Sequence, residues 1–116
     1  MPPDSETLAS KILVVDDEMV VLDVMTRLLA REPDLSVTLA ESAEAAMEIL
    51  RAERFDLLVA DKNLPVMGGI ELAAESRKIW PTLEVVLITG FPSAESLVAA
   101  VAAGASDYIT KPFDDL

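Results

Sequence analysis

Four short apolar runs, rich in β-branched residues, each end on a polar or charged side chain. The runs are residues 12–15 before Asp16 and Asp17, residues 57–60 before Asp61, residues 85–88 before Thr89, and residues 108–110 before Lys111. Unbroken apolar runs of this length are typical of parallel strands that are buried on both faces. The carboxyl ends of parallel strands share one edge of a sheet, where open α/β sheets bind ligands. We therefore expect three carboxylates, a hydroxyl and an ammonium to converge there.

The segments between these runs show helical periodicity and one further strand. The expected elements are a helix that stops by Pro33, an alternating edge strand at 35–39, a helix capped by Ser42, a helix from about 69 to 79, and a helix that starts at Ser93 and ends at Gly104. Alternating strands and helices predict one α/β domain. Right-handed crossovers favour a flavodoxin-like, doubly wound, five-stranded parallel sheet in the order 2-1-3-4-5.

The two ends of the chain carry separate expectations. Residues 1–10, rich in Pro, Ser and acids, are expected to form a flexible leader before a domain over residues 11–116. Only residues 113–116 follow the last strand and its Lys-Pro pair, too few for a helix that would cover it. We expect a piece of a longer protein, truncated where a fifth helix should start.

Composition excludes several classes of site and partner. The chain has no cysteine and no histidine, which removes thiol nucleophiles, imidazole metal sites and histidine-based triads. With 21 acidic and 9 basic residues its net charge is −12, so direct binding of nucleic acid by this segment is not expected. No apolar run is long enough to span a membrane and no secretory signal is visible, so we expect a cytoplasmic protein with no membrane partner.

The three converging carboxylates need a compensating charge. Two unit charges about 4 Å apart repel by about 4 kcal/mol at an effective dielectric constant near 20. Either protons or a divalent cation among Asp16, Asp17 and Asp61 would relieve this repulsion. Oxygen ligands favour Mg²⁺, Ca²⁺ or Mn²⁺, and a site of a few carboxylates and water suits Mg²⁺ better than Ca²⁺. Asn63, two residues beyond Asp61, could add a backbone carbonyl ligand. For one of these acids alone, a helix-capping role explains its position equally well.

A carboxylate beside a cation can act as a ligand, a base or a nucleophile. With no Cys or His in the chain, Asp61 is the best nucleophile candidate. Attack of Asp61 on a phosphoryl group would form an acyl phosphate. The metal, Lys111 and the Thr89 hydroxyl would then offset charge on the phosphoryl oxygens.

These motifs together resemble a known family. The motifs are Val15-Asp-Asp-Glu18, Asp61-Lys-Asn-Leu-Pro65-Val-Met-Gly-Gly69, Thr89-Gly90 and Lys111-Pro112. Their order and spacing resemble the receiver domain of bacterial two-component response regulators over about residues 11–113. Leu64 stands where the family often has Met, and Gly68 stands where an Asp commonly precedes the Gly. Neither is expected to touch the phosphoryl site.

The resemblance implies a phosphoacceptor signalling switch rather than a turnover enzyme. It implies that Asp61 accepts a phosphoryl group from a partner sensor histidine kinase or phosphotransfer protein. It places Mg²⁺ on Asp17, Asp61 and the Asn63 carbonyl, with Asp16 acting through water. It assigns Thr89 and Lys111 to the phosphoryl oxygens.

The resemblance carries further expectations about the switch. It suggests a cis peptide between Lys111 and Pro112. It also implies that Thr89 moves to the phosphoryl group while Tyr108 turns inward, although a half-buried aromatic at a strand edge is an equally good explanation of Tyr108. We expect Asn63 and Phe91 to influence how water reaches the acyl phosphate, and so to tune dephosphorylation.

The output surface and two rival functions remain open at this stage. The family uses the fourth helix, the fifth strand and a fifth helix for homodimer or output contacts. The apolar stripe of the fourth helix, with Leu97 and Val101, is nonetheless interpreted here as core packing. The rivals are a small phosphohydrolase with an aspartate nucleophile and a receiver-like interaction module that takes no phosphate.

Overall fold

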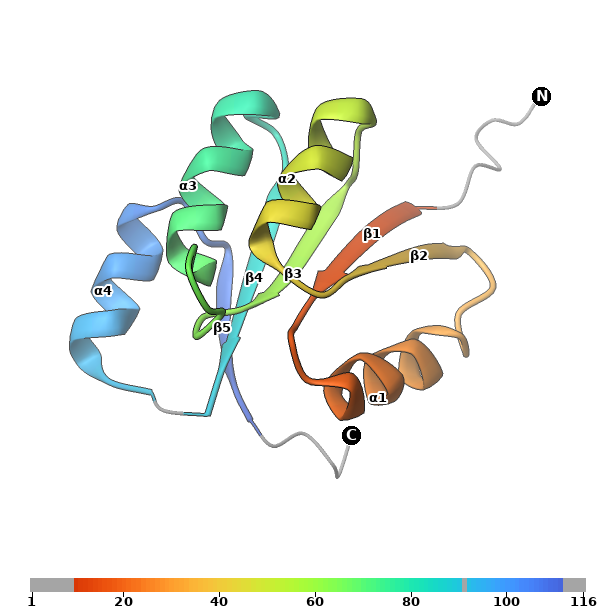
Figure 1. Cartoon of the computed structure of the whole chain (residues 1–116), viewed down its shortest axis with the longest axis horizontal. Helices are drawn as coiled ribbons and strands as arrows, with labels where there is room; N and C mark the ends of the chain where they lie inside the picture. Colours follow the sequence, from red (N-terminus) through yellow and green to blue (C-terminus); the bar gives the residue numbers. More distant parts are fainter. Residues whose placement is uncertain (1–9, 91, 112–116) are drawn as a thin grey trace.

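The computed structural model describes residues 10–90 and 92–111. Its elements are β1 Ser10–Val15, α1 Met19–Leu29, β2 Leu35–Ala40, α2 Ala43–Ala52, β3 Leu57–Asp61, α3 Gly69–Ile79, β4 Glu84–Thr89, α4 Ala94–Ala102 and β5 Asp107–Thr110. All strand pairs are parallel, and the order is β2-β1-β3-β4-β5, as predicted (Figure 1). Ser10 already belongs to β1, so the strand begins one residue before the expected boundary at 11.

Three predicted features lie wholly or partly outside the residues that the structure describes. Phe91 lies wholly outside them, and the expected leader and the Lys111–Pro112 peptide lie partly outside them. Residues 1–9 and 112–116 are in this group, so the expectations that concern them stay predictions. Within the described segments, no helix is long and apolar enough to cross a membrane.

The central strands of the sheet are buried on both faces by different helices. Leu13, Leu58 and Leu87 point to one face, where they pack with α2, α3 and Ala100 of α4. Val14 and Ile88 point to the other face, where they pack against α1. Figure 1 shows α1 on the opposite side of the sheet from α2, α3 and α4. This two-sided burial explains why the central strands are continuously apolar instead of alternating.

Local sequence signals set the ends of the helices. The Ser42 hydroxyl accepts a hydrogen bond from the amide of Ala45 at 3.1 Å and so caps α2. Ser93 caps α4 in a reciprocal box with Ser96. Gly104 follows α4 with φ +98°, a conformation that glycine adopts without steric cost. The caps predicted at Ser42 and Ser93 are confirmed, and the predicted C-cap Gly104 directly follows the observed C-cap residue Ala103.

The interpretation of the α4 stripe as core is wrong. Leu97 is 44% exposed and Val101 is 64% exposed, and their neighbour Val98 is also exposed. Ala100 is the residue of α4 that is fully buried. The small alanine side chains allow α4 to approach the sheet through Ala100, which turns the branched residues outward.

The start of α3 is fixed against the backbone of the last residue of β3. The Gly69 amide donates a hydrogen bond to the Lys62 carbonyl at 2.9 Å. A Cβ at position 69 would lie 2.2 Å from the Asp61 carbonyl oxygen and 2.8 Å from Lys62 Cα. Only glycine permits this approach, which holds α3 directly behind Asp61.

We predict that Gly69→Ala lowers the free energy of unfolding by about 2–3 kcal/mol, because backbone atoms must move to admit the methyl group. Gly90→Ala is the matched control, since a Cβ at position 90 meets no atom within 4 Å. Urea unfolding followed by circular dichroism measures both variants. Equal stability of the two variants would contradict the packing role assigned to Gly69.

Candidate functional site

The polar ends of the strands meet at one edge of the sheet, as predicted. They enclose a pocket of about 270 Å³ that is lined by Asp17, Glu18, Asp61, Asn63, Gly90 and Lys111. Asp17 and Glu18 come from the turn after β1, Asp61 ends β3, and Lys111 follows β5. The Lys111 amide donates to the Thr89 carbonyl at 2.7 Å, which continues the β4–β5 pairing to the pocket.

Three carboxylates form an acidic cluster at this edge of the sheet. Oxygen atoms of Asp16, Asp17 and Asp61 all lie within 4.8 Å of one another. Asp16 is fully buried and Asp61 is 5% exposed, whereas Asp17 is exposed. The Asn63 amide donates to Asp61 Oδ1 at 3.2 Å, and the Glu18 amide donates to Asp16 Oδ1 at 2.8 Å. These backbone contacts orient both buried carboxylates toward the pocket.

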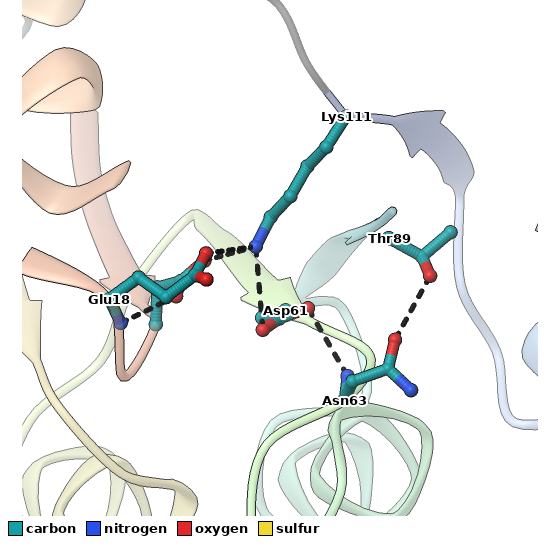
Figure 2. Close-up of polar contacts among 6 residues, drawn as sticks. Glu18, Asp61, Asn63, Thr89 and Lys111 are labelled. Atoms are coloured by element: carbon teal, nitrogen blue, oxygen red, sulfur yellow. Dashed lines mark hydrogen bonds and ion pairs between the residues drawn. The ribbon is translucent and has the colours of Figure 1, made fainter. Parts of the chain in front are cut away.

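The Lys111 ammonium lies between three acids. Its Nζ donates a hydrogen bond to Glu18 Oε1 at 2.9 Å and forms ion pairs with Asp16 Oδ2 at 3.2 Å and Asp61 Oδ2 at 3.5 Å (Figure 2). Burial alone would lower the pKa of Lys111. The contacts with Glu18 and Asp16 and the charge of Asp61 outweigh burial, so the pKa of Lys111 is raised above its ordinary value. Lys111 therefore stays positively charged at neutral pH.

Asp16 shows that one ammonium does not satisfy the acidic cluster. Burial raises the pKa of Asp16 above its ordinary value of 3.8, and the negative charge of Asp61 raises it further. The contacts of Asp16 with Glu18 and Lys111 lower this pKa, but they do not cancel the increase. Asp16 Oδ2 is buried and accepts no hydrogen bond from the described residues, although it lies within ion-pair distance of Lys111. A buried oxygen without a donor, beside two further carboxylates, fits a divalent cation with oxygen ligands.

Thr89 and Asn63 are in direct contact across the pocket. The fully buried Thr89 donates its hydroxyl hydrogen to Asn63 Oδ1 at 3.0 Å (Figure 2). Asn63 therefore binds Asp61 through its backbone amide and Thr89 through its side chain. This contact between residues 63 and 89 links the end of β3 to the end of β4.

Tyr108 does not line the acidic pocket. Its hydroxyl lies 2.6 Å from Ser96 Oγ, the hydroxyl that also completes the cap of α4. Tyr108 instead lines a groove between α4 and β5 together with Leu97 and Val101. In this structure the tyrosine therefore faces α4 and lies away from Asp61.

Glu18 and Ser96 are the two polar residues that sequence reasoning missed. Glu18 was part of a recognised motif but had no assigned role, and it is the nearest acid to Lys111. Its 93-residue separation from Lys111 left no local signal for this contact. Ser96 stands three residues after the capping Ser93, a spacing that could have indicated a reciprocal cap. Its contact with Tyr108 had no sequence signal.

We predict that Asp16→Asn stabilises the metal-free protein at pH 7 by about 0.5–2 kcal/mol, the range of typical stabilising substitutions. The gain in the free energy of unfolding should vanish near pH 3, where Asp16 is protonated in both states. It should grow as the pH rises past 3.8, because Asp16 then loses its proton more readily in the unfolded chain than in the folded chain. Urea unfolding with a chelator at several pH values measures this, with the exposed Asp23→Asn as control. A gain that is independent of pH would contradict the prediction.

Comparison with known proteins places this arrangement in a family. The model of the response regulator receiver domain matches residues 12–116. The response regulator protein FleR of Pseudomonas aeruginosa is 36% identical over 109 residues, which cover 92% of this chain and 22% of FleR. The regulatory protein TcrX of Mycobacterium tuberculosis is 36% identical over 102 residues, which cover 88% of this chain and 43% of TcrX. The chain thus spans less than half the length of these relatives.

Solved structures agree with the sequence relatives. A CheY-like receiver domain from Methanospirillum hungatei superposes with a TM-score of 0.86 at 34% identity, and the match covers 91% of this chain and 84% of that one. A response regulator from Burkholderia pseudomallei, solved with a phosphorylated aspartic acid and a calcium ion, gives a TM-score of 0.83 at 30% identity over 90% of this chain and 61% of that one. The chain belongs to the response regulator receiver domain family.

Proposed function

We propose that this domain is a phosphorylation-controlled switch in which Asp61 is the phosphoacceptor. The observation that carries the proposal is the position of Asp61, which is buried among two other acids and Lys111 but lines an open pocket. The similar Burkholderia protein carries a phosphorylated aspartic acid. A similar receiver domain, DrrB, with 31% identity and a TM-score of 0.83, is described as activated by BeF3.

The proposed chemistry is transfer of a phosphoryl group from a phosphohistidine on a partner protein. An Asp61 carboxylate oxygen forms a bond to phosphorus while the phosphorus–nitrogen bond of the donor breaks and leaves its electron pair on the imidazole. The product is an acyl phosphate on Asp61. Lys111, already 3.5 Å from Asp61 Oδ2, is positioned to bind a phosphoryl oxygen.

Mg²⁺, or Mn²⁺ in its place, is the proposed cofactor. Asp17, Asp61 and the Asn63 carbonyl would hold the ion, with Asp16 acting through water. When bound, such a cation offsets the charge of the carboxylates and of the phosphoryl oxygens. The buried oxygen of Asp16 that lacks a donor supports this assignment.

Thr89 and Tyr108 are proposed to report phosphorylation to the surface. In the structure the Thr89 hydroxyl binds Asn63 and the Tyr108 hydroxyl contacts Ser96, so both have partners that they would exchange on switching. A complete population shift from 1:99 to 99:1 needs about 5.5 kcal/mol. Two exchanged hydrogen bonds supply only part of that, so we expect a partial shift.

The two rival functions find less support. A phosphohydrolase with an aspartate nucleophile usually presents a second Asp two positions on, and here Asn63 occupies that place with its side chain bound to Thr89. An inert interaction module would not need Asp16, Asp17, Asp61 and Lys111 gathered at one edge of the sheet. We propose that Asn63 and Phe91 instead tune the hydrolysis of the acyl phosphate.

The proposed partners follow from the family. A sensor histidine kinase or phosphotransfer protein would supply the phosphoryl group to this domain in the cytoplasm. The exposed apolar face of α4, made of Leu97, Val98 and Val101, would bind a second copy of the domain together with the neighbouring strand β5. The acidic surface argues against a direct contact between this segment and nucleic acid.

We predict that the chain forms an Mg²⁺-dependent adduct with acetyl phosphate that Asp61→Asn abolishes, because an amide cannot act as the nucleophile. Intact-protein mass spectrometry measures the adduct, and Asp23→Asn, at an exposed position on α1, is the control. Continuous release of phosphate with no lasting adduct would support the hydrolase. No reaction at any donor concentration would support the inert module.

We predict that beryllofluoride with Mg²⁺ promotes a dimer through the α4–β5 face, and that Val98→Glu prevents it by placing a charge in the apolar contact. Sedimentation velocity measures the dimer. Val20→Glu is the matched control because Val20 is similarly exposed, at 74% against 68% for Val98, but lies on α1. A parent that stays monomeric with beryllofluoride bound would contradict this prediction.

A further inference from the structure

Glu18 has an unusual position at the edge of the acidic pocket. It directly precedes α1, yet its side chain makes no capping hydrogen bond to that helix. Its backbone amide is held by Asp16 Oδ1 at 2.8 Å, and its carboxylate accepts a hydrogen bond from Lys111 at 2.9 Å. Figure 2 shows the Glu18 side chain reaching toward the Lys111 ammonium. The carboxylate is therefore directed to the lysine instead of to its own helix.

The ion pairs of Lys111 with its three acids differ in how easily each can be broken. Asp16 is fully buried and would be left without water, and Asp61 is the proposed site of phosphorylation. The Glu18 side chain is 60% exposed, so its carboxylate can exchange the lysine for water. The ion pair between Glu18 and Lys111 is thus the one whose loss costs the least free energy.

A bound cation would increase this difference. The cluster that could hold a cation consists of Asp16, Asp17 and Asp61 and does not include Glu18. A divalent ion there offsets the charge of Asp16 and Asp61 and so weakens their attraction for Lys111. Glu18 then remains the acid whose charge is not offset, and it lies beside the lysine on the wall of the same pocket.

We propose that the Glu18 carboxylate competes with the phosphoryl group for Lys111 and thereby weakens the binding of phosphoryl anions at Asp61. The proposal rests on the proposed phosphoacceptor function. An incoming phosphoryl group carries up to about two negative charges and needs the same ammonium. It must either displace Glu18 from Lys111 or bind beside an uncompensated carboxylate, and both routes reduce its affinity.

The test uses the full chain with saturating Mg²⁺ and beryllofluoride as the phosphoryl surrogate, followed by ¹⁹F NMR. Glu18→Gln keeps the shape of the side chain but removes its charge, and Glu18→Ala removes both. Each should lower the half-saturating beryllofluoride concentration by about three- to fivefold, as expected for loss of an exposed charge. Glu41→Gln is the matched control, because Glu41 is exposed, follows β2 at the same sheet edge, and has no described contact with Lys111.

The outcomes separate this proposal from the one on which it rests. If the parent chain binds no beryllofluoride, the phosphoacceptor function fails and the role of Glu18 fails with it. If the parent binds but both Glu18 variants bind equally well or more weakly, only the competition is overturned. Mg²⁺ titration followed by amide NMR is the second measurement. A loss of Mg²⁺ affinity in Glu18→Gln well beyond that in Glu41→Gln would make Glu18 a metal ligand and overturn the proposal.

Discussion

Mutual repulsion among Asp16, Asp17 and Asp61 is the constraint around which this edge of the sheet is organised. Their oxygens lie within 4.8 Å of one another, and the single nearby ammonium of Lys111 leaves Asp16 Oδ2 without a hydrogen-bond donor in the described residues. Such a cluster costs stability when it is empty, which is typical of functional sites. The two-sided burial of β1 and β3 supplies the rigidity that holds these acids together despite the repulsion.

Other polar side chains near this edge each have a hydrogen-bond partner that a new ligand could replace. Lys111 has Glu18 as its hydrogen-bond partner, Thr89 has Asn63, and Tyr108 has Ser96. The first two contacts join segments that are far apart in the chain, and the third joins the consecutive elements α4 and β5. A new anion at Asp61 would compete for Lys111 and Thr89, and so alter contacts at the ends of β4 and β5. These are the contacts that the proposed phosphorylation of Asp61 would change.

Most of the fold was predictable because its signals are local. The β-branched runs, the capping Ser42 and Ser93, and the glycine after α4 each act within a few residues, and the structure confirms all of them. The α4 stripe was misinterpreted because helical periodicity identifies an apolar face but does not say what covers it. Ala100 packs on the sheet, and the larger side chains of Leu97 and Val101 are exposed.

The sequence by itself determined most of the chemical groups at the site, although not the role of Glu18, because a parallel sheet brings the ends of its strands to one edge. It therefore predicted the meeting of Asp16, Asp17, Asp61, Thr89 and Lys111. Only the tertiary structure decided the partner of each group. The nearest acid to Lys111 is Glu18, 93 residues away, and the hydroxyl that contacts Tyr108 belongs to Ser96. Such pairings depend on distances between packed elements, which no local pattern in a single chain encodes.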